Sequence, residues 1–223
     1  KGGNIKKKYV MLPNWVDTDF VKPLTPSISL MYRLNFSKDD FIVLYSGNLG
    51  EKQGLELILE VAKEVLHIKE IKFLICGSGA VKEKLIGIKV RLGLSNVFFQ
   101  KLLPYNELPE LMSIGKIHLV IQKKGAGDLV MPSKLTTILA SGGLAIITAE
   151  PETSLFKITK DNNIALCIPG ENSQILKETI LSIYNNQKNY DAIKSNAHHY
   201  ALRYLNKNAV LTDFDSYLQT KKE

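Results

Sequence analysis

A helix that begins next to a lysine, after a glycine-rich loop, is the feature of this sequence best suited to chemistry. The loop Gly125-Ala126-Gly127-Asp128 leads to Met131-Pro132-Ser133-Lys134, where Pro132 opens the helix and Ser133 is expected to cap it. A helix start carries partial positive charge, and the added lysine suits it for a phosphate. The carboxylate of Asp128 suits sugar hydroxyls. A capped helix behind a flexible loop remains the alternative interpretation.

Two shorter glycine turns, Gly47-Asn48-Leu49-Gly50 and Gly77-Ser78-Gly79, each lie between an apolar run and a helical pattern. Small residues at such a place let backbone N–H groups approach an anion. Lys52 and Gln53 belong to the first of these loops. A glycine turn between a strand and a helix is more often a plain connection. The chain has neither G-x-G-x-x-G nor G-x-x-x-x-G-K-[ST], which disfavours a P-loop and weakens a dinucleotide site without excluding it.

Six short apolar runs alternate with helical patterns and must position these loops. Runs that are apolar throughout indicate strands buried on both faces, and helices between them make the sheet parallel. We predict an α/β protein: a Rossmann-like, doubly wound, six-stranded parallel sheet with C-terminal helices. Ligands bind such sheets at the carboxyl ends of the strands. The predicted strands are 41–46, 71–76, 96–100, 118–122, 144–148 and 164–168. The predicted helices are 55–66, 80–92, 105–115, 133–141, 154–160, 173–186, 190–205 and 210–219.

The composition bounds the class of protein. The 223 residues (25.0 kDa) are 45% hydrophobic and 23% charged, as in ordinary globular domains. The net charge of +7 suits an acidic partner, whether nucleic acid, anionic lipid or a phosphorylated ligand. A lysine-rich composition accounts for it equally. Because no stacking pattern of aromatic and basic residues is present, we expect no nucleic-acid partner.

Cysteines and histidines point to no metal centre. Cys76 and Cys167 lie in apolar runs without a C-x-x-C or Cys/His cluster, so we expect no metal and no cofactor. His118, in the fourth predicted strand, is interpreted as a core histidine rather than a catalytic base. Two buried thiols suit a reducing compartment, and no run reaches the ~18 apolar residues of a bilayer span, so we expect a cytoplasmic location. The chain begins at Lys1, and we expect a piece of a longer protein.

Five stretches of the sequence follow one another in a characteristic order. They are LPNWVDTDFVKPL, YSGNLGEKQGLELILEVA, FLICGSGAVKEKL, NVFFQKLLPYNELPELM and DLVMPSKLTTILASGGLAII. In this order and spacing, over residues 9 to about 185, the chain resembles the C-terminal half of a retaining family 4 glycosyltransferase with the GT-B fold. The subgroup that it resembles is the colanic-acid and O-antigen group, of the fucosamine-transferase kind. SGNLGEKQGLE and LVMPSKLTTILASG are the most specific stretches.

The resemblance implies a domain that binds a UDP-sugar, with a UDP-N-acetyl amino sugar as one candidate donor. The first glycine loop then lies against the diphosphate, the loop after the third strand contacts the base, and the loop before Lys134 holds the sugar and phosphates. Lys52 and Lys134 would stabilise the leaving nucleotide diphosphate. The donor-binding residues implied are Gly47, Asn48, Leu49, Gly50, Gly77, Gly79, Lys101, Leu102, Leu103, Gly127, Asp128, Met131, Pro132, Ser133 and Thr137.

The sequence departs from the family pattern at several of these positions. Asn48 stands where Arg is usual, and Lys52 comes one place before the usual Lys. The two positions of the family's Glu-x7-Glu motif fall on Leu129 and Thr137, with Asp128 adjacent to the first. A threonine replaces only part of the hydrogen bonding that the second Glu gives to a ribose. These departures leave Lys52 and Lys134 as the expected phosphate cations and Asp128 as the expected sugar ligand.

The resemblance thus implies the donor-binding half of a retaining glycosyltransferase of cell-surface polysaccharide biosynthesis. A lipid-linked or saccharide acceptor would bind a missing N-terminal domain, and the isolated chain would transfer little or no sugar. We divide the chain into an interdomain segment (1–24), a Rossmann-like nucleotide-sugar-binding domain (25–185) and C-terminal helices (186–223) that close it or cross back. A nucleotide-binding module without catalysis and a GT-B-fold nucleotide-sugar epimerase are the alternatives. Peripheral association with the inner membrane face is a further expectation.

Overall fold

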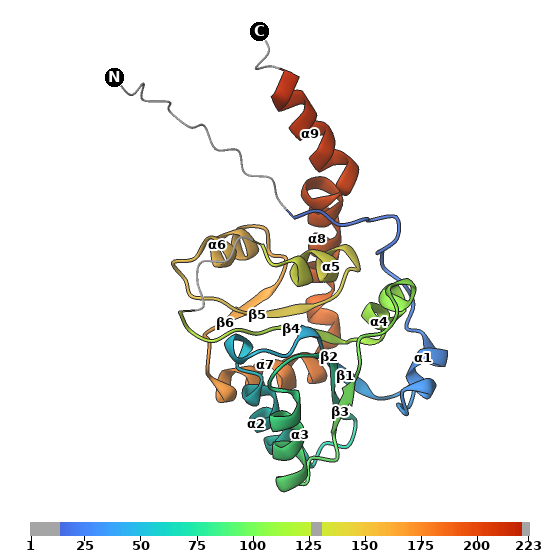
Figure 1. The fold of residues 1–223 in the computed structure, drawn as a ribbon, viewed down its shortest axis with the longest axis vertical. Helices are drawn as coiled ribbons and strands as arrows, with labels where there is room; N and C mark the ends of the chain where they lie inside the picture. The colour runs from blue at the N-terminus through green and yellow to red at the C-terminus, as the bar shows by residue number, and fades with distance from the viewer. Residues whose placement is uncertain (1–13, 126–130, 220–223) are drawn as a thin grey trace.

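A six-stranded, all-parallel sheet forms the centre of the protein (Figure 1). The computed structural model describes residues 14–125 and 131–219. The order β3-β2-β1-β4-β5-β6 reverses direction between β1 and β4, which is the doubly wound arrangement predicted from the sequence. In spatial order the strands are β3 (Val97–Gln100), β2 (Ile71–Ser78), β1 (Phe41–Asn48), β4 (Ile117–Val120), β5 (Ala145–Thr148) and β6 (Leu166–Ile168).

Strands β1 and β2 continue two residues beyond their predicted ends. Gly47 pairs with Gly77 and Asn48 with Ser78, so half of the predicted first glycine turn is strand. The glycines allow this continuation, because a Cβ on Gly77 would lie 2.0 Å from the carbonyl oxygen of Gly47. The ladder therefore carries Asn48 out to the carboxyl edge of the sheet.

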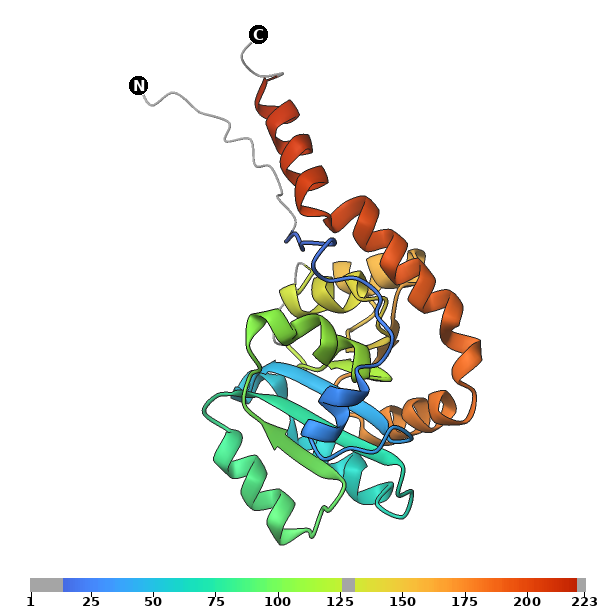
Figure 2. The same ribbon diagram turned by 90° about the vertical axis from the view of Figure 1, so that its right-hand side faces the viewer.

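Helices cover both faces of the sheet, and each face has its own apolar core (Figure 2). Alternate residues of β1 face opposite ways: Ile42 and Leu44 enter one core, and Phe41 and Val43 enter the other. This explains why the strands are apolar throughout. The α-helices of the described residues are α1 (Ile28–Arg33), α2 (Glu56–Glu64), α3 (Lys82–Arg91), α4 (Leu108–Ile114), α5 (Ser133–Ala140), α6 (Ser154–Asp161), α7 (Ser173–Asn185), α8 (Asp191–Tyr200) and α9 (Lys207–Gln219).

Only the middle part of the predicted helix over 190–205 is α-helical. A 3-10 helix (Gln187–Tyr190) precedes α8, and a π-helical turn (Ala201–Leu205) follows it. Beyond that turn α9 projects away from the sheet layers (Figures 1 and 2). Within the described residues, no helix combines the length and the apolarity that a bilayer span requires.

The segment before α1 is tied to the C-terminal helices. The Val16 N–H donates to the Leu205 carbonyl at 2.8 Å, and the Lys207 N–H donates to the Val16 carbonyl at 3.1 Å. These bonds join residues from the two ends of the chain. The division of the chain at residues 24 and 185 stays a prediction.

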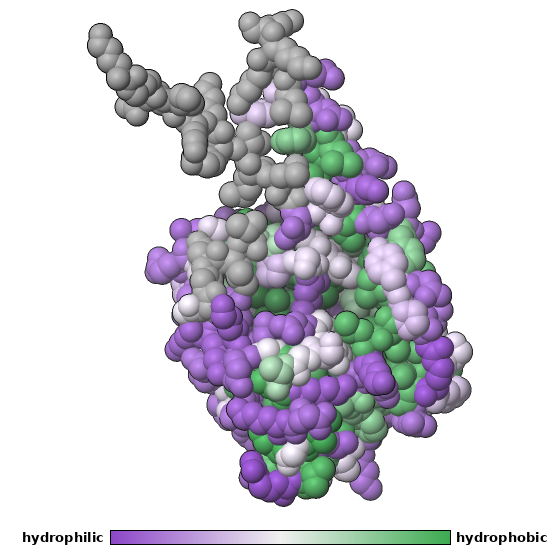
Figure 3. Space-filling model, in the orientation of Figure 1, coloured by the Kyte–Doolittle hydropathy of each residue, from purple (hydrophilic) through white to green (hydrophobic). Residues whose placement is uncertain are grey.

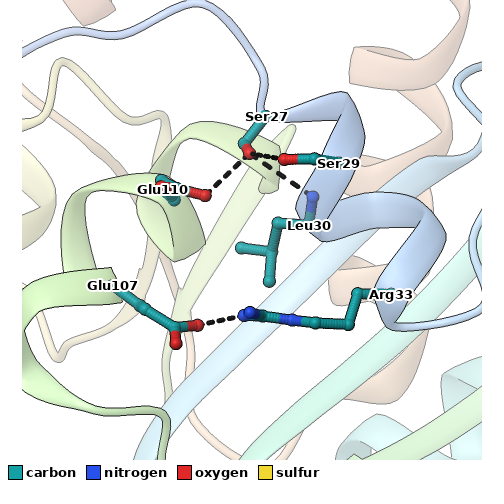
Figure 4. A network of polar contacts seen from close by, with 6 residues as sticks. All are labelled: Ser27, Ser29, Leu30, Arg33, Glu107 and Glu110. Atoms are coloured by element: carbon teal, nitrogen blue, oxygen red, sulfur yellow. Dashed lines mark hydrogen bonds and ion pairs between the residues drawn. The ribbon is translucent and has the colours of Figure 1, made fainter.

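Helix α1 is fastened to α4 by a small polar network (Figure 4). Ser27 caps α1, accepting the Leu30 N–H, and donates to a carboxylate oxygen of Glu110 at 2.8 Å. Arg33 forms an ion pair with Glu107. Exposed ion pairs contribute little, so burial of Leu30 supplies more of the docking energy. The network matters because α4 lines the candidate site.

Hydrophobic residues interrupt the polar surface around α1 and α4 (Figure 3). Leu24, which precedes α1, is 44% exposed, and Ile28, the first residue of α1, is 41% exposed. Both belong to the segment that the network fastens to α4.

Candidate functional site

A cavity of about 450 Å³ opens at the carboxyl edge of the sheet, where the strand order reverses between β1 and β4. This is the place where doubly wound sheets bind ligands. Its walls come from the ends of β1 and β4, from α4, and from the start of α5. The described lining residues are Leu44, Tyr45, Ser46, Gly47, Asn48, Gln53, Leu108, Met112, His118, Leu119, Val120, Ile121, Gln122, Pro132, Ser133, Lys134, Thr137 and Ile138.

The cavity wall at β1 depends on glycines that pack behind it. A Cβ on Gly79 would lie 2.4 Å from the Leu49 carbonyl oxygen, and one on Gly77 would strike Gly47. Gly77 and Gly79, predicted to bind the donor, therefore support the Gly47 turn from behind and do not line the cavity. The turn is further fixed by Gln53, whose side-chain oxygen accepts the Gly50 N–H at 3.1 Å.

Tyr45 joins this turn to the lysine at the start of α5. Its hydroxyl donates to the Asn48 carbonyl at 2.6 Å, and the Nζ of Lys134 lies 3.5 Å from the centre of its ring. The end of the Lys134 side chain also touches Gly47, since a Cβ there would lie 3.0 Å from Cε. Tyr45 thus holds the backbone of the turn and the cation together. From the sequence, Tyr45 is only one residue of the predicted strand 41–46.

Lys134 is the only lysine or arginine among the described lining residues, and none of them bears a carboxylate. Its ammonium forms no ion pair with a described residue. Burial lowers the pKa of Lys134 to about 7, because the charged form loses hydration. The ring of Tyr45 compensates only in part, as cation–π contacts do. No described residue therefore supplies a negative charge to this ammonium, and an anionic ligand would do so.

The start of α5 adds to this preference for an anion. The N-cap is Pro132, which has no side-chain cap, and Ser133 is the first helical residue. The predicted capping role of Ser133 is therefore wrong: a residue at the first helical position cannot cap its own helix. The backbone N–H groups of Ser133 and Lys134 donate to no described residue. A helix start left uncapped beside a cavity suits a phosphate.

The structure brings only part of the predicted donor-binding set to the cavity. Six of the predicted residues line it: Gly47, Asn48, Pro132, Ser133, Lys134 and Thr137. Leu49 and Met131 are buried in the core, and Gly50 adjoins the turn. Lys52, Lys101 and Leu102 are exposed, and these three, with the half-buried Leu103, do not line the cavity. Gly127 and Asp128 lie outside the described residues.

His118 lies in β4, with its side chain almost fully buried, as the core interpretation predicts. Burial lowers its pKa to about 4, so the imidazole is neutral at pH 7. The ring is held between two glycines, since a Cβ on Gly115 or Gly143 would lie 2.8 or 2.7 Å from it. Its Nε2 has no hydrogen-bond partner among the described residues.

Comparison with known proteins gives one clear family. The family model described as "Glycosyl transferases group 1" matches residues 29–200. A relative, the colanic acid biosynthesis glycosyl transferase WcaI of Escherichia coli (strain K12), is 37% identical over 215 residues. The match covers 95% of this chain and 52% of WcaI, so the chain spans about half the length of that relative.

Solved structures of low sequence identity share the fold. Anabaena Alr3699/HepE, in complex with UDP and glucose, superposes with a TM-score of 0.78 at 15% identity, over 92% of this chain and 55% of that one. The C-terminal domain of the group 1 glycosyl transferase LpcC from Francisella tularensis gives 0.71 at 16% identity, over 86% of this chain and 99% of that one. The second match covers a domain crystallised on its own.

Proposed function

The chain belongs to the group 1 glycosyl transferase family, and on that premise we propose that it is the donor-binding half of such an enzyme, taking a UDP-sugar in the cavity between β1, β4 and α5. One observation carries the proposal. Lys134 lies there without a counterion among the described residues, beside a helix start with no side-chain cap, and no described lining residue carries a carboxylate. A nucleotide diphosphate fits that charge. HepE, which shares the fold, was crystallised with UDP.

The proposed chemistry is retaining transfer of the sugar to an acceptor held by a second domain. Lys134 neutralises charge that develops on the leaving diphosphate, which directly lowers the barrier. Lys52 is exposed and does not line the cavity, and its contact with the diphosphate stays part of the proposal. No metal is required in this scheme, and the described residues contain no cluster that could hold one. Asp128 keeps its proposed role as sugar ligand.

The wider biological setting follows from the relative. WcaI bears a colanic acid biosynthesis name, and we assign this chain to cell-surface polysaccharide biosynthesis. A lipid-linked or saccharide acceptor, a cytoplasmic location and peripheral contact with the inner membrane face belong to the same proposal. The net charge of +7 is compatible with an anionic lipid surface.

Calorimetric titration of UDP into the 223-residue chain tests donor binding. Wild type should bind UDP more tightly than Lys134→Ala, and Lys52→Ala should fall between them. Equal affinities of wild type and Lys134→Ala would remove Lys134 from the site. NAD, titrated in parallel, should bind more weakly than UDP, because a second nucleoside is attached to its diphosphate.

A sugar-transfer assay with the same chain tests the half-enzyme proposal. A polyprenyl-linked acceptor and radiolabelled UDP-sugar should give little or no product, since the acceptor site lies in the other half. Robust turnover would overturn this part of the proposal.

A binding module without catalysis is the second candidate. Thr137 lines the cavity at the position of the family's second glutamate, so one ribose contact is weakened. UDP binding by the chain together with no transfer by the full-length protein would favour this candidate. Interconversion of UDP-sugars by the full-length protein, seen in product analysis, would indicate an epimerase instead.

A further inference from the structure

Gln122 lies in the cavity two residues after β4 ends. It is not among the donor-binding residues expected from the sequence. Its backbone is held by Thr148, the last residue of β5. The Gln122 N–H donates to the Thr148 hydroxyl oxygen at 2.8 Å, and that hydroxyl donates back to the Gln122 carbonyl at 3.0 Å. Regular pairing between β4 and β5 ends at Val120 with Ile147. The buried Thr148 therefore still joins the two segments where the regular pairing of β4 with β5 stops.

The side-chain amide of Gln122 is available to a ligand. It forms no hydrogen bond with any described residue, although the residue is half-buried. Gln53, the neighbouring glutamine of the lining, differs because its oxygen already accepts the Gly50 N–H. A half-buried amide with a fixed backbone and no protein partner gains most from a ligand that supplies hydrogen bonds.

Two walls of the cavity differ in chemistry, and this indicates which part of the ligand Gln122 meets. The wall from α4 and the middle of α5 is largely apolar, with Leu108, Met112 and Ile138. The wall from the ends of β1 and β4 carries the amides of Asn48 and Gln122. A nucleotide-sugar has the same polarity: a flat base at one end, a polyhydroxyl sugar at the other, and the diphosphate between them.

We propose that Gln122 is a specificity-determining residue that hydrogen-bonds the sugar of the donor, with Thr148 as its positioning residue. The proposal rests on the nucleotide-sugar site described above. An amide donates and accepts at once, which matches a sugar hydroxyl or an acetamido group. The hydroxyl of Thr148 acts only through the backbone of Gln122.

Calorimetry with UDP, UDP-glucose and UDP-N-acetylglucosamine tests the role of Gln122. In Gln122→Met, which keeps the side-chain length, UDP affinity should stay within about twofold of wild type. The affinity for at least one UDP-sugar should fall about 5- to 10-fold, as expected for one lost hydrogen bond. Gln174→Met, on the exposed side of α7, is the matched control and should change neither ligand.

The outcomes distinguish failure of the proposed nucleotide site from failure of the role proposed for Gln122. If wild type binds no UDP, the nucleotide site itself is refuted. If UDP binds and Gln122→Met weakens UDP as much as the UDP-sugars, or weakens none of them, the role of Gln122 is overturned.

Thr148 is tested by the same selectivity. Thr148→Val removes the hydroxyl at nearly constant shape and should lower affinity for the UDP-sugars relative to UDP, while Thr148→Ser restores the wild-type ratio. An equal loss for UDP and UDP-sugars in Thr148→Val would mean that the threonine acts on the fold alone. Thermal unfolding of both variants shows whether each remains folded at the titration temperature.

Discussion

Donor affinity should depend on pH through Lys134. Burial beside Tyr45 lowers the pKa of this lysine from 10.5 to about 7 in the free protein. A bound diphosphate favours the ammonium and raises that pKa again. Binding above pH 7 therefore requires uptake of a proton. The charged fraction of free Lys134 falls from about one half at pH 7 to about one hundredth at pH 9, which predicts roughly a 50-fold weaker UDP affinity.

Calorimetry measures both parts of this prediction. Titration of UDP at pH 8 in two buffers of different ionisation enthalpy should report uptake of about 0.9 proton per UDP. Lys134→Met should bind weakly at pH 7 and 9 alike, because it has no charge to lose. Lys134→Arg keeps its charge throughout this range, so any binding it retains should not vary with pH. A wild-type affinity that stays constant from pH 7 to pH 9, without proton uptake, would refute the reasoning.

The same burial gives Lys134→Met a second signature, in folding stability. The unfolded chain holds the lysine proton up to its ordinary pKa of 10.5, whereas the folded chain releases it near pH 7. The unfolded state thus binds more protons between those values, and wild-type stability gains with rising pH there. At pH 7 the burial of Lys134 lowers the free energy of unfolding by on the order of 4 kcal/mol, relative to a side chain that is neutral in both states. Lys134→Met should therefore unfold at higher urea than wild type at pH 7, with a smaller difference at pH 10.

Three further predictions concern Gly77, His118 and metal dependence. Gly77→Ala should lower the free energy of unfolding by about 3 kcal/mol or more and abolish UDP binding, since its Cβ would meet the Gly47 carbonyl oxygen at 2.0 Å. Urea unfolding measures the first effect, and calorimetry measures the second. Wild type should lose about 3 kcal/mol of stability as the pH falls from 6.5 to 4, because burial penalises the charged form of His118 and lowers its folded pKa to about 4. His118→Gln should lack this loss, which urea midpoints at pH 7 and pH 4 measure for both proteins. A chelator should leave UDP affinity unchanged, because no described lining residue carries a carboxylate; loss of affinity that magnesium restores would contradict this.

Most of the fold follows from local pattern. Strands buried on both faces must be apolar at every position, so runs such as 41–46 identified the strands and the parallel sheet. The rule that ligands bind at the carboxyl ends then located the site. The predicted ends of β1 and β2 were wrong by two residues, because a glycine pattern looks alike in a turn and in a strand that needs close backbone approach.

The candidate site was only partly accessible to sequence reasoning. The start of α5 with Lys134 was found because its residue types are consecutive. Tyr45 and Gln122 were not found, since nothing near them in sequence marks them as lining residues. The lysine at 134 meets the ring of Tyr45, and Gln122 is held by Thr148, through contacts between separate elements.

By itself, then, the sequence determined which loops could hold an anion, because residue type and strand–helix order are local properties. Only the tertiary structure decided which lysine enters the cavity. Lys134 lies inside it against Tyr45, and Lys52 faces solvent. Both lysines follow glycine-containing loops, and their sequences do not show which of the two side chains is buried. The difference arises because burial, and with it the lowered pKa of Lys134, depends on what distant segments pack around each side chain.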